Sequence, residues 1–257
     1  MPAAWDDFCV WLSARLILAV VGLAAFGCFV TGCSSSRTWL VAALGDSVPR
    51  GTNCDCRPYP PLTADDLAAS SGRSVAATND AVAGATTASV LGQLNSDDAV
   101  INHVRTADAI EIEVGANDVG YSKSCATAVD CYASELPSLE TNLAAIVARA
   151  RELTTGHKVV VVLLDYWSVW LGGQYAVAQG PAYARAAEQV TDKVDSIIRA
   201  TATETGSSYV DLRAAFKGPD YAYDETHFLS SDGDHPNAAG HAQIAKAVDA
   251  VLGNALG

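Results

Sequence analysis

A serine at the end of an apolar run is the first residue with candidate chemistry in this sequence. Residues 39–44 are apolar, and Gly45, Asp46 and Ser47 follow them directly. A buried strand that ends in a tight glycine turn presents the next hydroxyl at the carboxyl edge of a sheet, where open α/β folds bind their ligands. We therefore predict that Ser47 is a nucleophile; the alternative is a serine that only caps or turns the chain.

A short acidic segment near the C-terminus, Asp-Gly-Asp-His-Pro-Asn, offers a general base for this serine. The pKa of a free histidine, about 6.5, lies close to neutral pH, so His235 suits this role. A carboxylate must orient the ring, and Gly233 permits a turn that brings Asp232 back to His235. Asp234 is the alternative, although adjacent side chains in an extended segment point apart.

Two further residues are candidate donors to a negative charge on a substrate oxygen. Gly84 has no side chain, so its backbone N–H can approach a substrate closely, unless this glycine only serves a turn. Asn117 follows a predicted strand at residues 109–114 and carries an amide to the sheet edge where Ser47 is also expected. The sequence thus predicts that these loops converge at one site.

The same predicted strand carries two carboxylates on one face, Glu111 and Glu113. Because the strand is expected to be central, these groups must be paired, hydrogen-bonded or protonated. We expect Glu113 to be partly exposed at the end of the strand. Nothing in the sequence explains Glu111.

Strand-like and helix-like segments alternate along the chain, which predicts a three-layer α/β/α sandwich. The predicted strands cover residues 39–44, 75–78, 109–114, 158–164 and 208–212. The predicted helices lie near residues 63–68, 87–94, 136–153, 181–205 and 238–252. An aromatic stretch follows the fourth predicted strand. We expect it either to line an acyl or sugar pocket or to pack internally. Its aromatic residues are Tyr166, Trp167, Trp170, Tyr175 and Tyr183.

The composition describes an acidic chain that folds. Its 257 residues suffice for one domain with a full hydrophobic core, and half of them are apolar. The formal net charge is −13, and 15 basic and 27 acidic side chains remain when residues 1–32 are removed. Such a surface repels phosphate backbones and no basic stripe is present, so we predict no nucleic-acid partner.

The N-terminus is predicted to direct export. Residues 16–30 form an apolar run of signal-peptide length, and Val-Thr-Gly-Cys at its end resembles a bacterial lipobox with Cys33 as the lipidated residue. We assign residues 1–33 to a signal peptide, 34–38 to a short leader and 39–257 to the domain. The expected location is the extracytoplasmic side, either anchored to the membrane through Cys33 or, if Cys33 is not lipidated, secreted.

The domain keeps an even number of cysteines, Cys54, Cys56, Cys125 and Cys131. In an exported protein these thiols favour two disulfides, and neither pair has the two-residue spacer usual for zinc. Cys125 and Cys131 flank a five-residue loop that they can close. Pairing Cys54 with Cys56 across one residue is strained, so cross-pairing between the loops is left open. The remaining histidines show no metal-binding pattern, and we predict no metal.

Four short blocks together resemble the SGNH (GDSL) hydrolase family in order and spacing: Gly45-Asp46-Ser47, Gly84 after Asn79, Gly115-x-Asn117-Asp118 and Asp232-x-x-His235-Pro236. The resemblance covers about residues 40–252. It departs at Ala81, where many members have glycine, which puts the shape of that loop in doubt. No Gly-x-Ser-x-Gly elbow surrounds Ser47, so the α/β-hydrolase fold is disfavoured.

The resemblance implies a flavodoxin-like, parallel five-stranded sheet with strand order 2-1-3-4-5. It implies a Ser47 nucleophile, a His235 base oriented by Asp232, and an oxyanion hole from the backbone N–H groups of Ser47 and Gly84 and the amide of Asn117. No cofactor is implied.

We therefore expect an exported esterase or lipase acting on carboxylic esters. An O-deacetylase of cell-envelope or plant polysaccharide is the second reading, favoured by export and the aromatic stretch. A non-catalytic binding lipoprotein is the third, and it would normally have lost Ser47, Asn117 or His235.

Overall fold

A five-stranded parallel sheet with the order β2-β1-β3-β4-β5 forms the centre of the fold. The structure, a computed structural model, describes residues 37–256. Its strands are β1 (Trp39–Gly45), β2 (Val75–Asn79), β3 (Ala109–Glu113), β4 (Val160–Leu164) and β5 (Ser208–Val210). The predicted fold class and strand order are confirmed.

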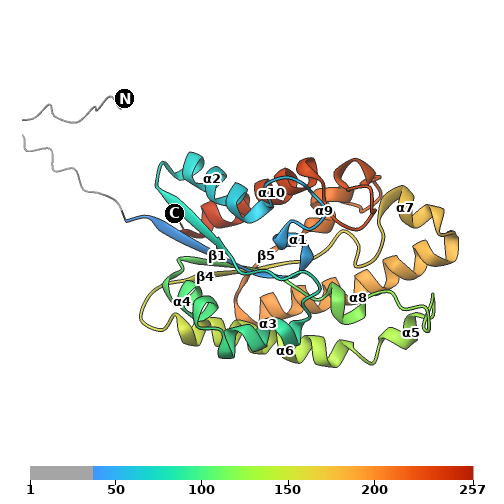
Figure 1. The fold of residues 1–257 in the computed structure, drawn as a ribbon, viewed down its shortest axis with the longest axis horizontal. Helices are drawn as coiled ribbons and strands as arrows, with labels where there is room; N and C mark the ends of the chain where they lie inside the picture. The colour runs from blue at the N-terminus through green and yellow to red at the C-terminus, as the bar shows by residue number, and fades with distance from the viewer. Residues whose placement is uncertain (1–36, 257) are drawn as a thin grey trace, which may run out of the picture. The chain divides into compact units, whose positions relative to one another are not determined.

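Helices cover both faces of this sheet (Figure 1). One face carries α2 (Tyr59–Ser71), α9 (Leu212–Lys217) and α10 (Ala238–Leu256). The other carries α3 (Thr87–Ser96), α4 (Asp98–Thr106), α6 (Leu136–Leu153) and α8 (Pro181–Thr205). The shorter elements are α1 (Ser47–Arg50), η1 (Ala116–Val119), α5 (Val129–Tyr132), α7 (Gly173–Ala178) and η2 (Thr226–Phe228).

The central strands are buried along their length because helices cover both of their faces. Every residue of β3 and β4 is buried, and β4 has the all-apolar sequence Val-Val-Val-Leu-Leu. A continuous apolar run of this kind is typical of a parallel strand between two helical layers. The sheet and its two helical layers therefore share one hydrophobic core.

Local sequence signals set the ends of several helices. α10 begins after Asn237, whose side-chain oxygen accepts hydrogen bonds from the backbone N–H groups of Ala239 and Gly240 at 2.8 and 3.1 Å. α2 begins at Tyr59, four residues before the predicted start of this helix at residue 63, and Thr63 is buried within the helix. Prolines fit in this first turn because the N–H groups there have no partner within the helix.

Glu111 and Glu113 are both fully buried in β3, so the partial exposure predicted for Glu113 is wrong. The strand is flanked by β1 and β4 and covered by helices, and it ends before it reaches solvent. Burial raises the pKa of both carboxyls well above the ordinary value of glutamic acid. Burial thus favours the protonated form of both side chains, one of the three states expected for buried carboxyls.

The predicted signal peptide, the lipobox and Cys33 lie outside the described residues. Within residues 37–256, none of the helices combines the length and the apolar character that crossing a bilayer requires.

We expect Glu111→Gln to change how stability depends on pH. In the unfolded chain a glutamate loses its proton above about pH 4.3, whereas buried Glu111 keeps it. The folded state therefore binds the extra proton, and the free energy of unfolding falls as pH rises above that value, by at most ~1.4 kcal/mol per pH unit. The melting temperature of the variant should rise relative to wild type between about pH 5 and pH 8.

Glu140→Gln, on the exposed surface of α6, is the matched control and should show no such trend. A pH-independent difference between Glu111→Gln and wild type would contradict a protonated, buried Glu111.

Candidate active site

Ser47 lies directly after β1, at the first position of α1. Gly45 makes the preceding turn with φ +150°, and any Cβ there would collide with the backbone carbonyl oxygen of Glu113. Asp46 then caps α1 by accepting a hydrogen bond from the backbone N–H of Val48 at 3.0 Å. The tight glycine turn that the sequence predicted is present, and it brings Ser47 to the carboxyl edge of the sheet.

Asp46 is itself buried, with 1% of its surface exposed. Its second carboxylate oxygen accepts a hydrogen bond from the Tyr166 hydroxyl at 2.6 Å. Burial raises the pKa of Asp46 to about 6, and the hydrogen bonds from Tyr166 and Val48 oppose the rise. The Asp46–Tyr166 bond fixes the residue before Ser47 to the chain after β4. The sequence placed Tyr166 in an aromatic stretch but offered no signal for this pairing.

Asp232 and His235 face each other across a tight turn. The Nδ1 atom of His235 lies 2.7 Å from Oδ2 of Asp232, within hydrogen-bond distance. The other oxygen, Oδ1, accepts the backbone N–H groups of Asp234 and His235 at 3.1 Å each. Gly233 adopts φ +74°, and a Cβ there would collide with the ring of Tyr175, so the turn requires glycine. Tyr175 therefore packs against this turn.

Asp234 is farther from the histidine than Asp232 is. Its Oδ2 lies 3.9 Å from Nδ1 of His235, beyond hydrogen-bond distance. Burial raises the pKa of Asp232, but hydrogen bonds from Asn53, His235 and two backbone N–H groups outweigh it and lower this pKa to about 2. Asp232 is thus ionised at neutral pH and is the carboxylate placed to orient the ring.

Asn117 lies in η1, just after β3, and its amide nitrogen donates to the backbone carbonyl of Ala85 at 3.0 Å. The next residue, Asp118, accepts the backbone N–H of Thr87 at 2.9 Å. These bonds hold the loop containing Gly84 against the end of β3. Gly84 has φ +79° with open space around the position of a Cβ, so its backbone conformation explains the glycine.

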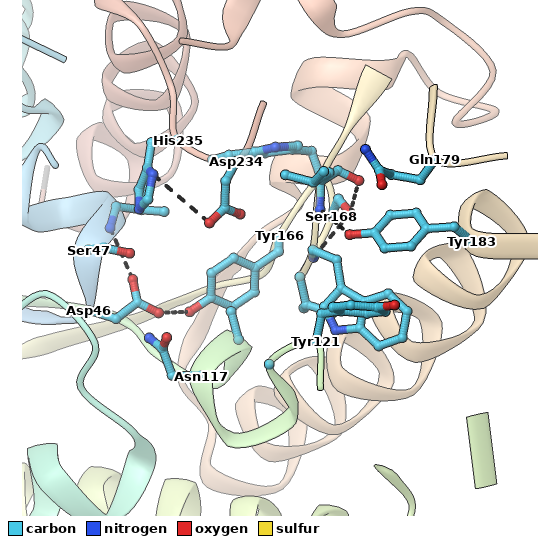
Figure 2. A pocket seen from close by; sticks show the side chains of 17 residues that line it. Asp46, Ser47, Asn117, Tyr121, Tyr166, Ser168, Gln179, Tyr183, Asp234 and His235 are labelled. Atoms are coloured by element: carbon cyan, nitrogen blue, oxygen red, sulfur yellow. Dashed lines mark hydrogen bonds and ion pairs between the residues drawn. The ribbon is translucent and has the colours of Figure 1, made fainter. Parts of the chain in front are cut away.

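A cavity of about 340 Å³ brings these groups together. In the view of Figure 2, Ser47, Asp46 and His235 lie at one end, Tyr121 and Tyr183 lie at the other, and Tyr166 lies between them. Asn117, Asp234 and Gln179 add polar groups to its lining, whereas Gly84 and Asp232 lie outside the residues that line it. Among residues 37–256, no hydrogen bond joins the Ser47 hydroxyl to His235; such contacts often form only with substrate bound.

Aromatic side chains form the far wall of the cavity. Trp170 donates from Nε1 to the backbone carbonyl of Val119 at 2.8 Å. Its ring contacts those of Tyr121 and Tyr183, with centroids 5.2 and 5.5 Å away. Trp167 stacks on Phe216 at 4.2 Å. The predicted alternatives, pocket wall or internal packing, are therefore both realised, since Trp167 and Trp170 are buried and also line the cavity.

The cysteines pair within each loop: Cys54 is bonded to Cys56, and Cys125 to Cys131. Of the two arrangements left open by the sequence, the structure adopts direct pairing. The first pair lies in the loop between α1 and α2, and the second closes the loop before α6. The Cys54–Cys56 loop also carries Asn53, whose amide reaches Asp232 and which sequence reasoning missed, since nothing distinguishes it from other surface-loop residues.

Solved structures that share this fold include esterases and lipases. A lipase from a goat rumen metagenome is 19% identical with a TM-score of 0.62, and the match covers 82% of this chain and 96% of that one. Phospholipase A1 from Streptomyces albidoflavus is 24% identical with a TM-score of 0.61, over 84% and 100% of the two chains. An acetylxylan esterase from Geobacillus stearothermophilus, a catalytic mutant, is 20% identical with a TM-score of 0.61, over 84% and 94%.

At these identities the likeness establishes the fold alone, and no curated protein matches the sequence. The model of the GDSL-like lipase/acylhydrolase family, however, matches residues 43–243, from within β1 into α10. This range includes every residue that carries the sequence resemblance. The chain therefore belongs to the GDSL-like lipase/acylhydrolase family.

Proposed function

We propose that the protein is an exported serine hydrolase of carboxylic esters, with Ser47 as nucleophile, His235 as general base and Asp232 as orienting carboxylate. The observation that carries the proposal is the Asp232–His235 hydrogen bond at a cavity that Ser47 also lines, in a chain of this family. Asp232, with its lowered pKa, stays charged and stabilises the imidazolium that forms during the reaction.

The reaction follows from these positions. Ser47 Oγ attacks the ester carbonyl carbon while Nε2 of His235 accepts the hydroxyl proton. The tetrahedral intermediate then collapses, and the leaving alcohol takes the proton from His235. Water, activated by the same histidine, attacks the acyl-serine and releases the carboxylic acid and free Ser47. Each proton that His235 accepts is returned, so the cycle closes with one water consumed.

Three donors stabilise the oxyanion in this proposal: the backbone N–H groups of Ser47 and Gly84 and the side chain of Asn117. Ser47 and Asn117 line the cavity, whereas Gly84 is included on the family resemblance. Ser47 is in the first turn of α1, where backbone N–H groups have no partner within the helix. The amide of Asn117 has two hydrogens, and the bond to Ala85 occupies one of them. That bond fixes the orientation of the amide and leaves the second hydrogen for the substrate.

A polysaccharide O-deacetylase is the second candidate, favoured by the aromatic wall. Tyr121, which contacts Trp170, is 45% exposed. Tyr121, Gln179 and Asp234 all line the cavity beside Ser47. An exposed aromatic ring beside hydrogen-bonding side chains suits a sugar ring. Rates on p-nitrophenyl esters of increasing acyl length, compared with rates on acetylated polysaccharides, decide between the candidates.

Ser47→Ala and His235→Ala should each lower the rate of ester hydrolysis by roughly 10⁴- to 10⁶-fold, and the double variant should be little worse. The reason is that nucleophile and base act as one unit. Single-turnover and steady-state rates of the three variants test this, with the exposed Ser134→Ala as control. Additive losses in the double variant would contradict the assignment.

Asn117→Ala should lower kcat by about 100- to 1,000-fold with little change in KM, because an oxyanion donor acts chiefly in the transition state. Asn142→Ala is the matched control: its amide bonds the Thr87 hydroxyl at 3.2 Å, near the same loop, but lies outside the cavity lining. It should affect the melting temperature without lowering kcat. A stable Asn117→Ala protein with near-normal kcat would remove Asn117 from the oxyanion hole.

Cys33→Ala should prevent lipid attachment, because the proposed lipobox requires that cysteine. Metabolic labelling with a fatty acid should mark the wild type and leave the variant unlabelled, and the variant should leave the membrane fraction or retain its leader. Equal labelling of both proteins would contradict the lipoprotein proposal.

A further inference from the structure

Asp232 receives a hydrogen bond from a distant loop. The amide nitrogen of Asn53 lies 2.6 Å from Oδ2 of Asp232, the oxygen that also contacts Nδ1 of His235 at 2.7 Å. Apart from Asn53 and the His235 ring, the donors to Asp232 within residues 37–256 are the backbone N–H groups of its own turn. Asn53 is therefore the contact that ties the 232–235 turn to the segment following the nucleophile.

The backbone around Asn53 has an uncommon shape. Asn53 and Asp55 adopt φ +59° and +50°, in the left-handed region that residues other than glycine seldom enter. Between and beside them, Cys54 and Cys56 are joined by a disulfide across one residue. This small covalent ring restricts the conformations that the loop can adopt. The loop is exposed to solvent at Asn53 and Asp55.

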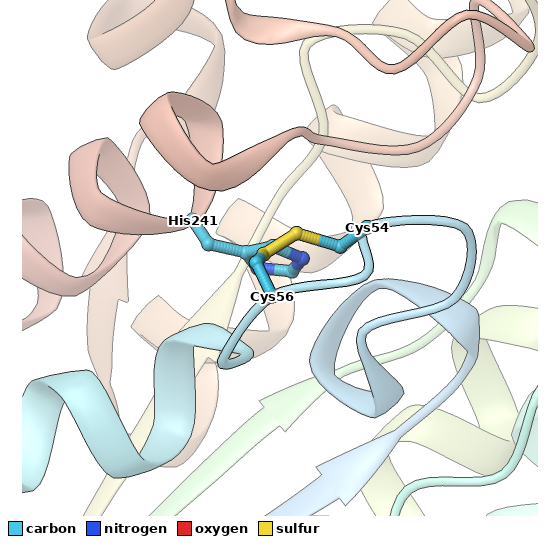
Figure 3. A group of neighbouring side chains, drawn as sticks. All are labelled: Cys54, Cys56 and His241. Carbon is cyan, nitrogen blue, oxygen red and sulfur yellow. A yellow bond between two sulfur atoms is a disulfide. The ribbon is translucent and has the colours of Figure 1, made fainter.

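The disulfide lies beside α10, the helix that follows the turn at residues 232–235. Figure 3 shows the sulfur atoms of Cys54 and Cys56 beside the ring of His241 in α10, and their sulfurs and one ring nitrogen lie within 4.8 Å of one another. His241 is fully buried, and burial lowers its pKa to about 4, so the ring is neutral at neutral pH. The loop is thus anchored to α10, six residues beyond His235.

We infer that Asn53 is a positioning residue for Asp232 and that the Cys54–Cys56 disulfide holds it in place, so that opening this disulfide slows ester hydrolysis. The inference rests on the proposed function of Ser47, His235 and Asp232. Asn53 fixes the oxygen that orients the imidazole, and the disulfide supplies the rigidity that an exposed loop lacks. A dithiol opens the bond by transferring two electrons and two protons to the cysteines, and is itself oxidised to a cyclic disulfide.

A metal ion is the competing use of this group. Two thiolates and a buried imidazole that has no hydrogen-bond partner among the described residues are ligands for a thiophilic cation. Sulfurs joined in a disulfide lack the thiolate charge that such binding needs. The bonded form in the structure therefore favours the positioning role, and the experiments below are run with a chelator present.

Asn53→Gly removes the donor without straining the backbone, because glycine tolerates positive φ. Asn53→Asp also tolerates this φ, but it replaces the donor with a second carboxylate beside Asp232. We expect Asn53→Gly to lower kcat by about 10-fold while KM changes by less than about twofold, since misplacing the base impairs chemistry more than binding. Asn53→Asp should lower kcat at least as much. The melting temperature of Asn53→Gly should change little. The NMR shift of the His235 Nδ1–H proton should move in both variants, an effect that a merely structural loop residue would not produce.

Reduction by a dithiol should lower the wild-type kcat to about the level of Asn53→Gly. A Cys54→Ser/Cys56→Ser variant should already have that rate and should no longer respond to the dithiol. Cys125→Ser/Cys131→Ser, the matched control, should still respond. In Asn53→Gly, reduction should add little, because the disulfide acts through Asn53.

Several results would overturn the inference: equal responses of Asn53→Gly and wild type to reduction, an unchanged His235 proton shift, or inhibition seen only when Zn²⁺ replaces the chelator. The last would assign Cys54, Cys56 and His241 to a metal site. Failure of the proposed function is distinguishable, because it appears as absent or Ser47-independent hydrolysis in the oxidised wild type, whereas the NMR shift reports the Asn53–Asp232 contact without substrate.

Discussion

The close backbone contact between the ends of β1 and β3 is the constraint on which the site depends. Gly45 pairs with Glu113, and a side chain at position 45 would strike the Glu113 carbonyl oxygen. The backbone N–H of Asp46 then donates to that same oxygen at 3.1 Å. Both strands therefore end at the same position along the edge of the sheet. Ser47 and Asn117 follow these neighbouring strands and line the same cavity.

Two aspartates of this site show how environment sets charge. Asp46 is buried, and its pKa is raised to about 6 because desolvation exceeds the effect of its hydrogen bonds. Asp232 is partly exposed and receives four hydrogen bonds, which lower its pKa to about 2. Asp232 therefore keeps its negative charge far below neutral pH, beside His235, whereas Asp46 takes up a proton in mildly acidic solution.

The loops around the cavity are held by contacts to one another as well as by the sheet. Asp118 binds Thr87 at the start of α3, and Asn117 binds Ala85 two residues earlier. Tyr166 connects the chain after β4 to Asp46. Each contact joins loops that follow different strands, so the positions of Ser47, Asn117 and the aromatic wall depend on one another.

The sequence by itself determined the parts of this protein that follow local rules. Apolar runs marked the strands, the helix predicted at residues 238–252 begins where α10 begins, and the glycine turn placed Ser47, because periodicity and turns depend on neighbouring residues. The spacing of Asp232 and His235 likewise predicted their contact across one turn. Only the tertiary structure decided the burial of Glu113 and the partners Tyr166 and Asn53, which lie 120 and 179 residues from the aspartates they bind. Such pairs form where separate elements pack together. The local sequence pattern of an element does not specify which other element it will contact.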